Sequence, residues 1–410
     1  MKKLLQIDTC LGVGSTGRIT ESIARLAQGQ GWECYIVHGA RYVKRPSCMT
    51  DIQSVSVLGE YAHFVGSLLF DNHGLDSACE TKRVVEQIKQ IKPDIIHLHC
   101  IHGYYLNYKV LFEYLRTTSI PVVWTFHDCW AFTGHCAYFD SVGCEKWKVE
   151  CGDCELKKTY PKSLVLDRSR HNYQLKKELF TSIGNQTRIV TVSNWLEGLV
   201  EESFLKKIRV QTIHNGIDLE VFKPRQTNVL KQQLKIDDKS VILGVAMPWS
   251  RRKGLEDMLK LATLLPRDRF QIVLIGLDDT QIQGLPNNVI GLKRTDSAET
   301  LAEFYSLAEV FVNPTYEDNF PTVNLEALAC GTPVITYKTG GSPEAVDDAT
   351  GWVVEQGRID EVARIVESLS AKEKQEIESQ RRACRLRAEK EFDKDKAFNS
   401  YLDLYTSLTS

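Results

Sequence analysis

The stretch from residue 313 to residue 341, NPTYEDNFPTVNLEALACGTPVITYKTGG, constrains the fold of this chain more than any other. An apolar run, VFVN, leads into a polar turn, and Pro321 then opens a helical pattern that stops at Gly331. A second apolar run, PVITY, ends before Gly340 and Gly341. Proline in the first turn and glycine just past the last turn are typical of helix ends. Strand, loop, helix and strand in this order predict a βαβ unit with two parallel strands.

The start of this predicted helix suits an anion. The first turn of a helix carries unpaired N–H groups and the positive end of the dipole, so it can bind phosphate. The residues that would form this phosphate site are Phe320, Pro321, Thr322 and Val323. Asp318 precedes the helix and Glu326 lies within it. Two carboxylates would repel a diphosphate, so we expect one or both of them to accept hydrogen bonds from sugar hydroxyls. The alternative is a capped surface helix with two solvated acids.

Length and composition describe an ordinary globular chain with two domains. Its 410 residues exceed what one core usually holds. A net charge of −2 gives no reason to expect nucleic acid as a partner. No apolar run approaches the roughly 18 residues of a membrane span. The start, MKKLLQIDTC, is typical of a first strand rather than a secretory signal, which favours a cytoplasmic protein.

The first half opens as a βαβ unit with a glycine-rich turn. The strand LLQID is followed by LGVGSTGRI and then by a helical pattern. Ligands of open α/β sheets bind at such strand ends, so Gly14, Ser15 and Arg18 are candidate binding residues. A tight turn without a ligand explains the same pattern equally well.

Histidines follow two later strands. PDIIHLHC carries His97 and His99, with His102 just beyond, and VVWTFHDC ends in His127 and Asp128. The first three could be metal ligands, but polar residues that line a cleft at a sheet edge are the favoured interpretation. A neutral imidazole at position 127 can bond a sugar hydroxyl or a leaving oxygen. The alternative is a structural histidine held by Asp128.

A long cysteine-rich loop occupies residues 129–160. Loops of this length are normally functional or held by an added constraint. Four thiolates could hold the loop through a structural zinc ion, with Cys136, Cys144, Cys151 and Cys154 as ligands. Disulfides, which a reducing cytosol disfavours, and free buried cysteines are the alternatives.

The second half contains a second α/β pattern. SVILGVAMPW is followed by Arg251, Arg252 and Lys253, whose charges would offset that of a diphosphate. Lys293 and Arg294 follow another strand. Two charged helices are expected between residues 359 and 390, and a last helix follows them. The aromatic segments YAHFVGSLLF and GYYLNYKVLFEYL could touch lipid, but are expected to be core helices.

EALACGTPV, the strand-end histidine, the hinge IHNGID and Lys253-Gly254 together resemble the retaining nucleotide-sugar glycosyltransferases of family four. The resemblance covers nearly the whole chain and is nearest to the bacterial enzymes of surface polysaccharide (colanic-acid-type) biosynthesis. The chain departs from the family pattern in two places. Asp318 stands where the family usually has Glu, with Glu317 one position away. Met247-Pro248 replaces the usual Gly-Arg, so Arg252 is expected to substitute.

The resemblance implies the GT-B fold, in which two Rossmann-like doubly wound domains face each other across a cleft and a C-terminal helix crosses back to the first domain. The predicted divisions are an acceptor-side domain at residues 1–217, a donor domain at 218–390 and the returning helix at 391–410.

The resemblance also implies a hexosyltransferase-type reaction with a UDP- or GDP-linked sugar, retention at the anomeric carbon and no catalytic metal. The implied acceptor is a saccharide or lipid-linked saccharide, reached at the inner face of the cell membrane. Asp318 and His127 would hold the donor sugar, while Lys253 and Arg252 would stabilise the leaving diphosphate. Glu326 would bind the ribose. Further donor contacts would come from Gly340, Gly341 and Glu344, and the loop near Lys293 and Arg294 would read the base.

Two other classes of protein remain open. A nucleotide-sugar epimerase has the same two-domain layout, although the hinge and EALACG favour a transferase. A non-catalytic relative could bind a nucleotide sugar without turning it over. An NAD-dependent dehydrogenase fits poorly, because no full dinucleotide fingerprint is present.

Overall fold

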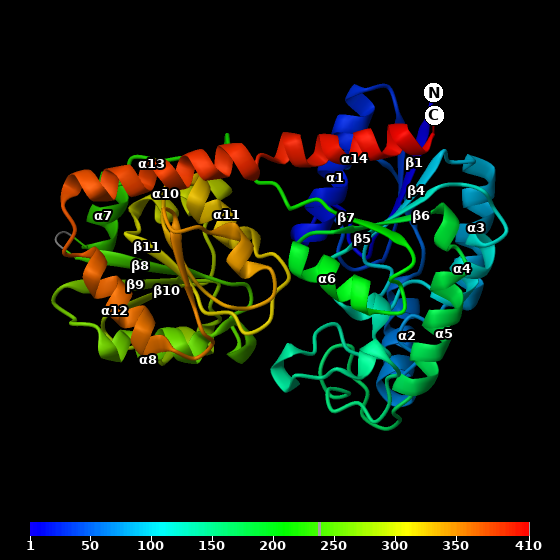
Figure 1. Cartoon of the computed structure of the whole chain (residues 1–410), viewed down its shortest axis with the longest axis horizontal. Coiled ribbons are helices and arrows are strands. Elements are labelled where there is room, and N and C mark those ends of the chain that lie inside the picture. Colours follow the sequence, from blue (N-terminus) through cyan, green and yellow to red (C-terminus); the bar gives the residue numbers. More distant parts are fainter. Residues whose placement is uncertain (237–238, 410) are drawn as a thin grey trace. The chain divides into compact units, whose positions relative to one another are not determined.

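The computed structural model describes residues 1–236 and 239–409. The chain forms two compact units, one of Met1–Ile213 with Phe398–Ser410 and the other of His214–Ala397. The hinge pattern predicts the divisions slightly elsewhere, after residues 217 and 390. Each unit is built on its own sheet, as Figure 1 shows.

The first unit is a seven-stranded sheet in the order β3-β2-β1-β4-β5-β6-β7, and all its strand pairs are parallel. The strands are β1 Lys3–Ile7, β2 Glu33–His38, β3 Thr50–Gln53, β4 Ile95–Leu98, β5 Val122–Phe126, β6 Thr187–Thr191 and β7 Arg209–Thr212. The helices between them are α1 Gly14–Gly29, α2 Val57–Phe70, α3 Ala78–Ile91, α4 Tyr108–Leu115, α5 Ser169–Thr181 and α6 Asn194–Glu202. The strand order reverses between β1 and β4.

The second unit is a six-stranded parallel sheet in the order β10-β9-β8-β11-β12-β13. Its strands are β8 Ser240–Val245, β9 Phe270–Ile275, β10 Val289–Leu292, β11 Val310–Asn313, β12 Val334–Tyr337 and β13 Gly351–Val354. Its helices are α7 Asn228–Leu234, α8 Leu255–Leu264, α9 Asp279–Gln283, α10 Ala298–Leu307, α11 Thr322–Ala329, α12 Ile359–Leu369 and α13 Lys374–Glu391. The strand order reverses between β8 and β11. Two doubly wound parallel sheets confirm the predicted α/β class.

Short 3₁₀ turns punctuate both units, and two of them carry predicted site residues. They are η1 Trp130–Phe132, η2 Asp140–Val142, η3 Lys146–Lys148, η4 Gly184–Gln186, η5 Arg251–Lys253 and η6 Ser342–Ala345.

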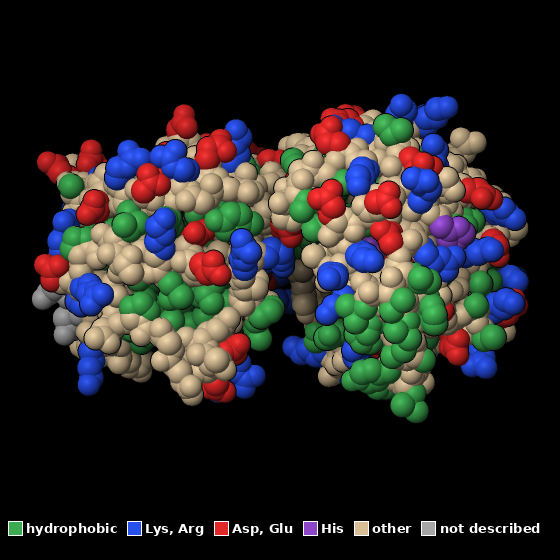
Figure 2. Space-filling view, turned by 90° about the horizontal axis from the view of Figure 1, so that it is seen from below, with side chains coloured by type: hydrophobic (Ala, Val, Ile, Leu, Met, Phe, Trp, Pro, Cys, Tyr) green, Lys and Arg blue, Asp and Glu red, His purple; other side chains and the backbone are tan. Residues whose placement is uncertain are grey.

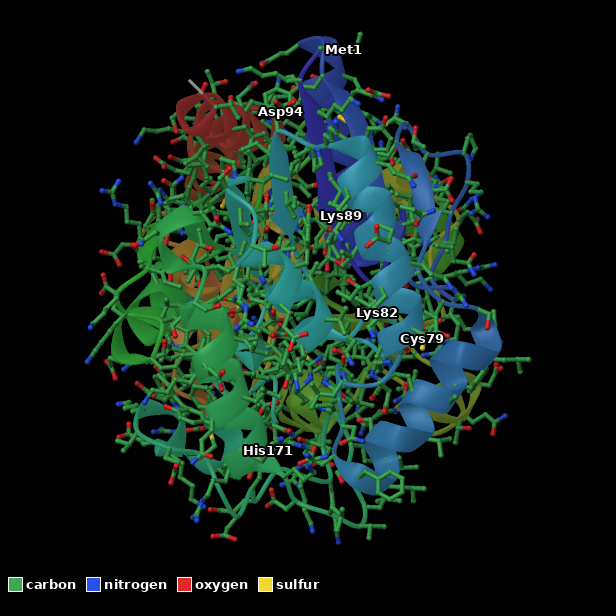
Figure 3. All side chains as sticks on the ribbon, turned by 90° about the vertical axis from the view of Figure 1, so that its right-hand side faces the viewer. Met1, Cys79, Lys82, Lys89, Asp94 and His171 are labelled. Carbon is green, nitrogen blue, oxygen red and sulfur yellow. The ribbon has the colours of Figure 1, made fainter. Side chains whose placement is uncertain are left out.

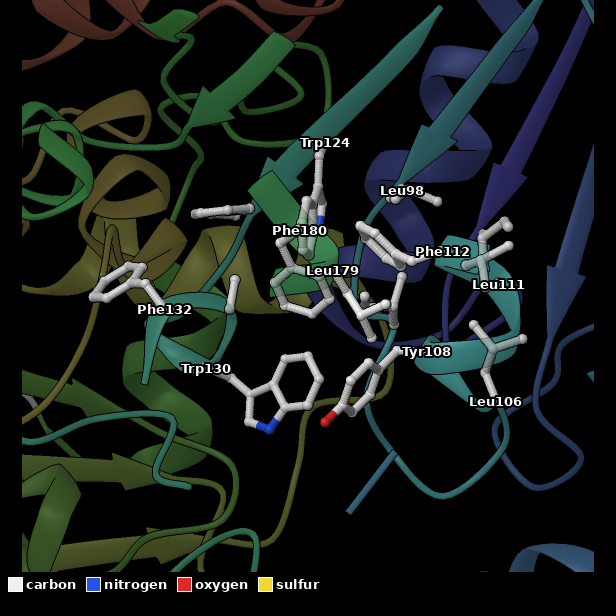
Figure 4. Close-up of a cluster of buried hydrophobic side chains, with 14 of the residues drawn as sticks. Leu98, Leu106, Tyr108, Leu111, Phe112, Trp124, Trp130, Phe132, Leu179 and Phe180 are labelled. Carbon is white, nitrogen blue, oxygen red and sulfur yellow. The ribbon is translucent and has the colours of Figure 1, made fainter. Parts of the chain in front are cut away.

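Aromatic side chains fill the core of the first unit (Figure 4). Phe180 of α5 lies with its ring centre 4.4 Å from that of Phe112 on α4 and 4.9 Å from that of Trp124 on β5. All three are buried. Tilted and edge-on ring pairs of this kind stabilise a core beyond the area they bury. They hold α4 and α5 against the strand that carries the predicted sugar-binding histidine.

Helix α3 shows the ordinary amphipathic pattern of a helix that covers a sheet. Val84, Val85 and Ile88 are buried, while Lys82 and Lys89 are exposed. Figure 3 shows Lys82 and Lys89 along the outer side of this helix. The spacing of the apolar residues follows the 3.6-residue period, and it directs one stripe to the core.

The last helix, α14 Lys394–Leu408, begins among the residues of the second unit and ends on the sheet of the first. The hydroxyl of Tyr405 lies 2.5 Å from Nδ1 of His97 on β4, and Lys2 Nζ donates to Thr409 Oγ1 over 2.8 Å. Tyr401 and Tyr405 are buried. The predicted return of the C-terminal helix to the first domain is therefore present.

The prediction for the two aromatic segments is right for one and wrong for the other. In α4 of GYYLNYKVLFEYL, Tyr108, Leu111 and Phe112 are buried, as expected for a core helix. In α2 of YAHFVGSLLF, the apolar side chains face outward, because the inner positions are taken by polar residues such as Glu60 and His63.

Candidate functional site

Polar side chains gather at the carboxyl ends of both sheets, next to the points where the strand order reverses. Open α/β sheets bind ligands at such switch points. In the first unit the point lies between β1 and β4, and in the second between β8 and β11. The predicted site residues follow these strands or their neighbours.

The predicted βαβ unit of the second sheet is confirmed. β11 pairs in parallel with β12, and α11 lies between them in the chain. Pro321 is the N-cap residue of α11 and has no side-chain group to cap the helix. Gly331 follows the helix with φ of 78°, a conformation that favours glycine. The first-turn N–H groups of α11 are thus available to an anion, as predicted for Thr322 and Val323.

The basic residues of η5 reach the loop that precedes α11. Lys253 Nζ forms an ion pair with the carboxylate of Asp318, and Arg252 Nη1 donates to the carbonyl of Glu317 over 2.7 Å. The side chains of Lys253 and Asp318 are both mostly buried. Two predicted site residues that lie far apart in the sequence are therefore in direct contact. Asp318, rather than Glu317, presents its side chain to this basic cluster.

Glu326 is held within α11 by a buried tyrosine. The hydroxyl of Tyr305, on α10, donates to Glu326 Oε2 over 2.9 Å. Burial, together with the Glu326 carboxylate, raises the pKa of Tyr305 well above its usual value. The tyrosine therefore remains a hydrogen-bond donor and orients the carboxylate. The sequence offered no signal for Tyr305, which sits in an ordinary helical pattern.

The turn after β12 places the predicted glycines beside the same loop. Gly341 N donates to the carbonyl of Asn319 over 2.8 Å, and Gly340 has φ of 50°. Glu344, in η6, accepts a hydrogen bond from Nε2 of His214 over 2.8 Å. The ring of His214 packs on Phe320 with 4.7 Å between ring centres. Phe320 is buried, so it supports the start of α11 rather than presenting a surface.

Lys293 and Arg294 lie on the surface after β10. Lys293 Nζ pairs with Asp279 Oδ1 at 2.5 Å, and both side chains are exposed. β10 is the edge strand of the sheet, two strands away from β8. These two residues thus follow the edge strand rather than a strand at the switch point.

In the first unit, Gly14 and Ser15 form the first turn of α1. Gly14 has φ of 68° and open space where a side chain would project. Arg18 is exposed, and its Nε donates to the carbonyl of Gly14 over 3.0 Å. The predicted glycine-rich turn therefore opens a helix at the carboxyl end of β1, close to the switch point.

His127 belongs to a chain of neutral hydrogen bonds. Its Nε2 lies 3.2 Å from Nδ1 of His99, whose Nε2 lies 3.1 Å from Oε1 of Gln6. Because the Gln6 oxygen only accepts, His99 carries its proton on Nε2 and accepts from His127. Burial lowers the pKa of His127 to about 4. His127 is therefore neutral at pH 7, with Nδ1 as a hydrogen-bond acceptor.

Asp128 holds a different histidine from the one expected. Its Oδ2 lies 3.0 Å from Nε2 of His102, whose Nδ1 lies 2.9 Å from the hydroxyl of Tyr160. A small pocket lies here, with His99, His102, His127 and Asp128 among its lining residues. Asp128 therefore bonds His102, and His127 is bonded by His99.

His97 has a structural role. It is fully buried between Tyr405 Oη and Thr125 Oγ1, at 2.5 and 2.8 Å. Its ring ties α14 to β4 and β5. Within residues 1–236 and 239–409, no group of three or more His, Cys, Asp or Glu side chains could hold a metal ion. The metal interpretation of the three histidines therefore has no support.

Sequence reasoning missed Asp8, the first residue after β1. It is fully buried, and Oδ2 has no hydrogen-bond partner in the described part of the chain. Oδ1 accepts from the N–H of Thr9 over 2.8 Å. Burial raises the pKa of this carboxyl to about 7. An aspartate that ends an otherwise apolar strand was the available signal.

The cysteine-rich loop packs on the core of the first unit. Cys136 is buried, and Cys144, Cys151 and Cys154 lie partly buried against the same cluster. Cys151 Sγ accepts from the N–H of Gly134 over 3.2 Å. The loop also contributes the buried rings of Phe132, Phe139 and Trp147. All four thiols are free, and they do not form a metal-binding group among the described residues. Packing of these rings and thiols against the core is what the structure shows holding the loop.

Two family models match the chain. The model described as Glycosyltransferase Family 4 matches residues 16–221, and the model described as Glycosyl transferases group 1 matches residues 226–390.

The matched relatives include a protein of Escherichia coli (strain K12) provisionally named colanic acid biosynthesis glycosyl transferase WcaC. It is 22% identical over 391 residues, which is 89% of each chain. D-inositol 3-phosphate glycosyltransferase of Mycobacteroides abscessus is 31% identical over 196 residues, or 44% of this chain and 43% of that protein.

Solved structures share the fold over the full length. Sucrose-phosphate synthase of Thermosynechococcus elongatus has a TM-score of 0.72 and 18% identity, with 100% of this chain and 99% of that chain covered. Anabaena HepE, solved with UDP, has a TM-score of 0.68 and 16% identity, with 99% of this chain and 100% of that chain covered. Together with the two parallel sheets, these similarities confirm the predicted GT-B fold.

Proposed function

Because this chain belongs to glycosyltransferase family 4, we propose that it transfers a sugar from a nucleoside diphosphate to a hydroxyl of a saccharide acceptor, with retention at the anomeric carbon. The observation that carries the proposal is the contact of η5 with the loop before α11, where Lys253 meets Asp318. The proposed pathway is the synthesis of a surface polysaccharide, as the name of the Escherichia coli relative suggests.

The donor is proposed to bind the second unit through its phosphates. Lys253, Arg252 and the first turn of α11 supply cationic and N–H groups at one switch point of the sheet. These are the groups that bind phosphate oxygens in proteins. Anabaena HepE, which shares the fold, was solved with UDP and with UDP-glucose. A uridine or guanosine diphosphate sugar is the proposed donor.

Two carboxylates are proposed to bind sugars on either side of these phosphates. Glu326, oriented by Tyr305, would accept hydrogen bonds from the ribose hydroxyls. Asp318, already beside Lys253, would accept them from the transferred sugar. Gly340, Gly341 and Glu344 would close the phosphate site, because their turn is bonded to the loop before α11.

In the proposed reaction, the bond between the anomeric carbon and the phosphate oxygen breaks as the bond to the acceptor oxygen forms on the same face. The acceptor proton passes to the departing phosphate oxygen. Lys253 and Arg252 would stabilise the charge that develops on the diphosphate. No metal ion is required for this step.

The first unit is proposed to bind the acceptor and to reach the donor sugar through His127. A neutral imidazole with an accepting Nδ1 can take a hydrogen bond from a sugar hydroxyl. Gly14, Ser15 and Arg18 would contact the donor diphosphate or the acceptor. The acceptor is proposed to be a saccharide, free or lipid-linked, used in the cytoplasm.

Melting in the presence of UDP, GDP, ADP or CMP tests the donor site. A nucleotide at about 100 times its dissociation constant stabilises a protein by roughly 2.7 kcal/mol. We expect one diphosphate to raise the Tm of the wild type, and Glu326→Ala to lose most of that shift. Glu378→Ala, an exposed acid on α13, is the control and should keep it. No shift with any nucleotide would contradict the proposed donor class.

Turnover tests the reaction itself. The wild type should hydrolyse or transfer the sugar of the nucleotide identified by melting, and EDTA should leave the rate unchanged. NMR of the first product formed should show the donor's anomeric configuration. Inversion, or a rate abolished by EDTA, would contradict the proposed mechanism, and binding without turnover would indicate a non-catalytic relative.

A further inference from the structure

Helix α2 has the opposite arrangement to that of a core helix. Its buried residues are Glu60, His63 and Ser67, each 1% exposed. The three lie on one stripe of the helix, at the i, i+3 and i+7 positions that usually carry apolar side chains. The large apolar side chains that face outward instead are Val57, Leu58, Tyr61, Val65, Leu69 and Phe70.

The polar contacts of the inner stripe fix this orientation. The carboxylate of Glu60 accepts from the N–H of Ala40 over 3.1 Å and pairs with Arg41 Nε at 3.0 Å. His63 accepts from the N–H of Gly74 over 3.1 Å, and its other nitrogen lies 3.0 Å from Ser77 Oγ. Turning the helix over would leave these buried groups unpaired, at a cost of ~1–3 kcal/mol each. The outward apolar face is therefore a property of the folded unit.

A second apolar segment lies beside the end of α2. Leu164 N donates to the carbonyl of Leu68 over 2.8 Å, so residues 164–166 run along the helix. Leu164, Val165 and Leu166 are all exposed. Figure 2 shows a broad gathering of hydrophobic side chains on one face, with Lys and Arg side chains at its border. Contiguous exposed apolar surface of this kind marks an interaction site on a soluble protein.

The chain next to this surface is basic and aromatic. Lys158 and Lys162 are exposed just before Leu164. The guanidinium of Arg41 lies 5.3 Å from the ring centre of Tyr61. Lysine, arginine and tyrosine around an apolar face suit the boundary between anionic headgroups and acyl chains.

Tyr160 connects this surface to the pocket of the same unit. Its side chain is half-exposed, yet its hydroxyl lies 2.9 Å from Nδ1 of His102, a lining residue of the pocket. Its ring also meets Tyr104 edge-on, and Tyr104 meets Phe64 of α2 in the same way. The proposed acceptor pocket and the apolar face are thus joined by one run of aromatic side chains.

We propose that the outward face of α2, together with residues 164–166, docks on an anionic lipid bilayer and brings a lipid-linked acceptor to the pocket at His102 and His127. The apolar side chains enter the boundary of the acyl chains, and Lys158 and Lys162 meet the headgroups. The docking is inferred from the residues of this surface alone. The identity of the acceptor rests on the proposed function.

Vesicle flotation with the full chain tests the surface. The probes are vesicles of phosphatidylcholine with phosphatidylglycerol and vesicles of phosphatidylcholine alone. The test variant is Leu58→Ser with Val65→Ser, at positions 80% and 48% exposed. The control is Leu386→Ser with Val229→Ser, at positions 62% and 68% exposed on α13 and α7. Melting curves of both variants establish that they fold.

The wild type and the control should float with the anionic vesicles, and the test variant should bind them about tenfold or more weakly. Lys158→Ala with Lys162→Ala should lower binding to the anionic vesicles about tenfold or more, since each cation near such a surface contributes about fivefold. Stabilisation by UDP or GDP should be the same in all variants, which separates this proposal from that of the donor site.

The proposal would be overturned if the wild type did not float, or if the test variant floated as well as the control. It would also be overturned if light scattering showed a dimer that only the test variant lost, because the face would then bind a second copy. If the wild type binds vesicles but no nucleotide, the docking proposal is supported and the proposed donor site is contradicted.

Discussion

At the carboxyl edge of the first sheet, the polar groups of the site are mostly neutral imidazoles. At the equivalent edge of the second sheet, they are charged. His99 and His127 are kept unprotonated by burial, whereas Lys253 and Asp318 form an ion pair. Neutral donors and acceptors suit sugar hydroxyls, and charges suit a diphosphate. The two sheets share a topology, but the groups at this edge are neutral in the first sheet and charged in the second.

The two edges also differ in how they are assembled. In the second unit, Asp318 and Glu326 come from one βαβ segment, and Lys253 joins them from one neighbouring turn. In the first unit, residues that follow β4 and β5 line the pocket, and one of them, His102, is bonded by Tyr160 of the cysteine-rich loop. A site carried by one segment is visible in the sequence, and a site gathered from several is not.

The largest expected effect comes from Lys253, at the carboxyl edge of the second sheet. Lys253→Ala should lower kcat by a factor of about 100 to 1,000, because it removes stabilisation of the leaving diphosphate. Lys260→Ala, an exposed lysine on α8, should leave kcat near that of the wild type. Steady-state kinetics measure both, and equal losses in the two variants would remove the special role of Lys253.

Lowering the pH should destabilise the first unit more than the second. His63 and His127 have pKa values lowered to about 4, and His73, His97 and His99 are also lowered by burial. A lowered pKa means that the unfolded state binds the proton first, so stability falls as pH drops from about 6.5 towards 4. For His63 the loss amounts to ~3 kcal/mol.

Hydrogen exchange at about pH 5 and about pH 7 measures this difference region by region. Peptides from β4 and β5 should lose protection at the lower pH, while peptides from β8 and β11 should lose much less. The raised pKa values of Asp8 and Asp76 oppose the trend, but the five histidines outnumber these two carboxyls. An equal loss of protection in both sheets would contradict the conclusion that buried neutral histidines make the first unit sensitive to acid.

His127→Phe tests whether His127, at the carboxyl edge of the first sheet, binds a sugar hydroxyl. The ring volume is roughly kept and the accepting nitrogen is lost, so kcat/KM should fall by a factor of about ten. His171→Phe, at an exposed histidine on α5, is the matched control. A His127 variant with unchanged kinetics and unchanged stability would exclude this residue from the site.

The smallest effect concerns Asp8. Its pKa is raised to about 7, so the carboxyl stabilises the folded state at low pH and that stability is lost as pH rises through 7. Between about pH 6 and about pH 8 the wild type should lose about 1 kcal/mol from this group. Asp8→Asn cannot ionise and should not show that loss. Denaturant unfolding at the two pH values measures this loss of stability. The same loss in the wild type and in Asp8→Asn would contradict the raised pKa of the Asp8 carboxyl.

Sequence patterns predicted the two sheets, the helix at Pro321 and most polar residues at the strand ends, because periodicity and helix-end residues act locally. They did not predict Tyr305, His214 or the partner of Asp128, because each depends on which strands and helices become neighbours. They also mispredicted α2. Its apolar residues indicated a core helix, but a pattern of apolar residues does not reveal which side faces the sheet.

The sequence by itself determined the fold class, the family and the position of the helix that is proposed to bind phosphate. The signal for each lies within short segments, where spacing dictates local structure and helix ends dictate anion binding. Only the tertiary structure decided which side chains meet: Lys253 with Asp318, His102 with Asp128, and His97 with Tyr405. It also decided that α2 faces outward, because buried polar partners such as Ala40 N–H and Gly74 N–H exist only once the unit has folded.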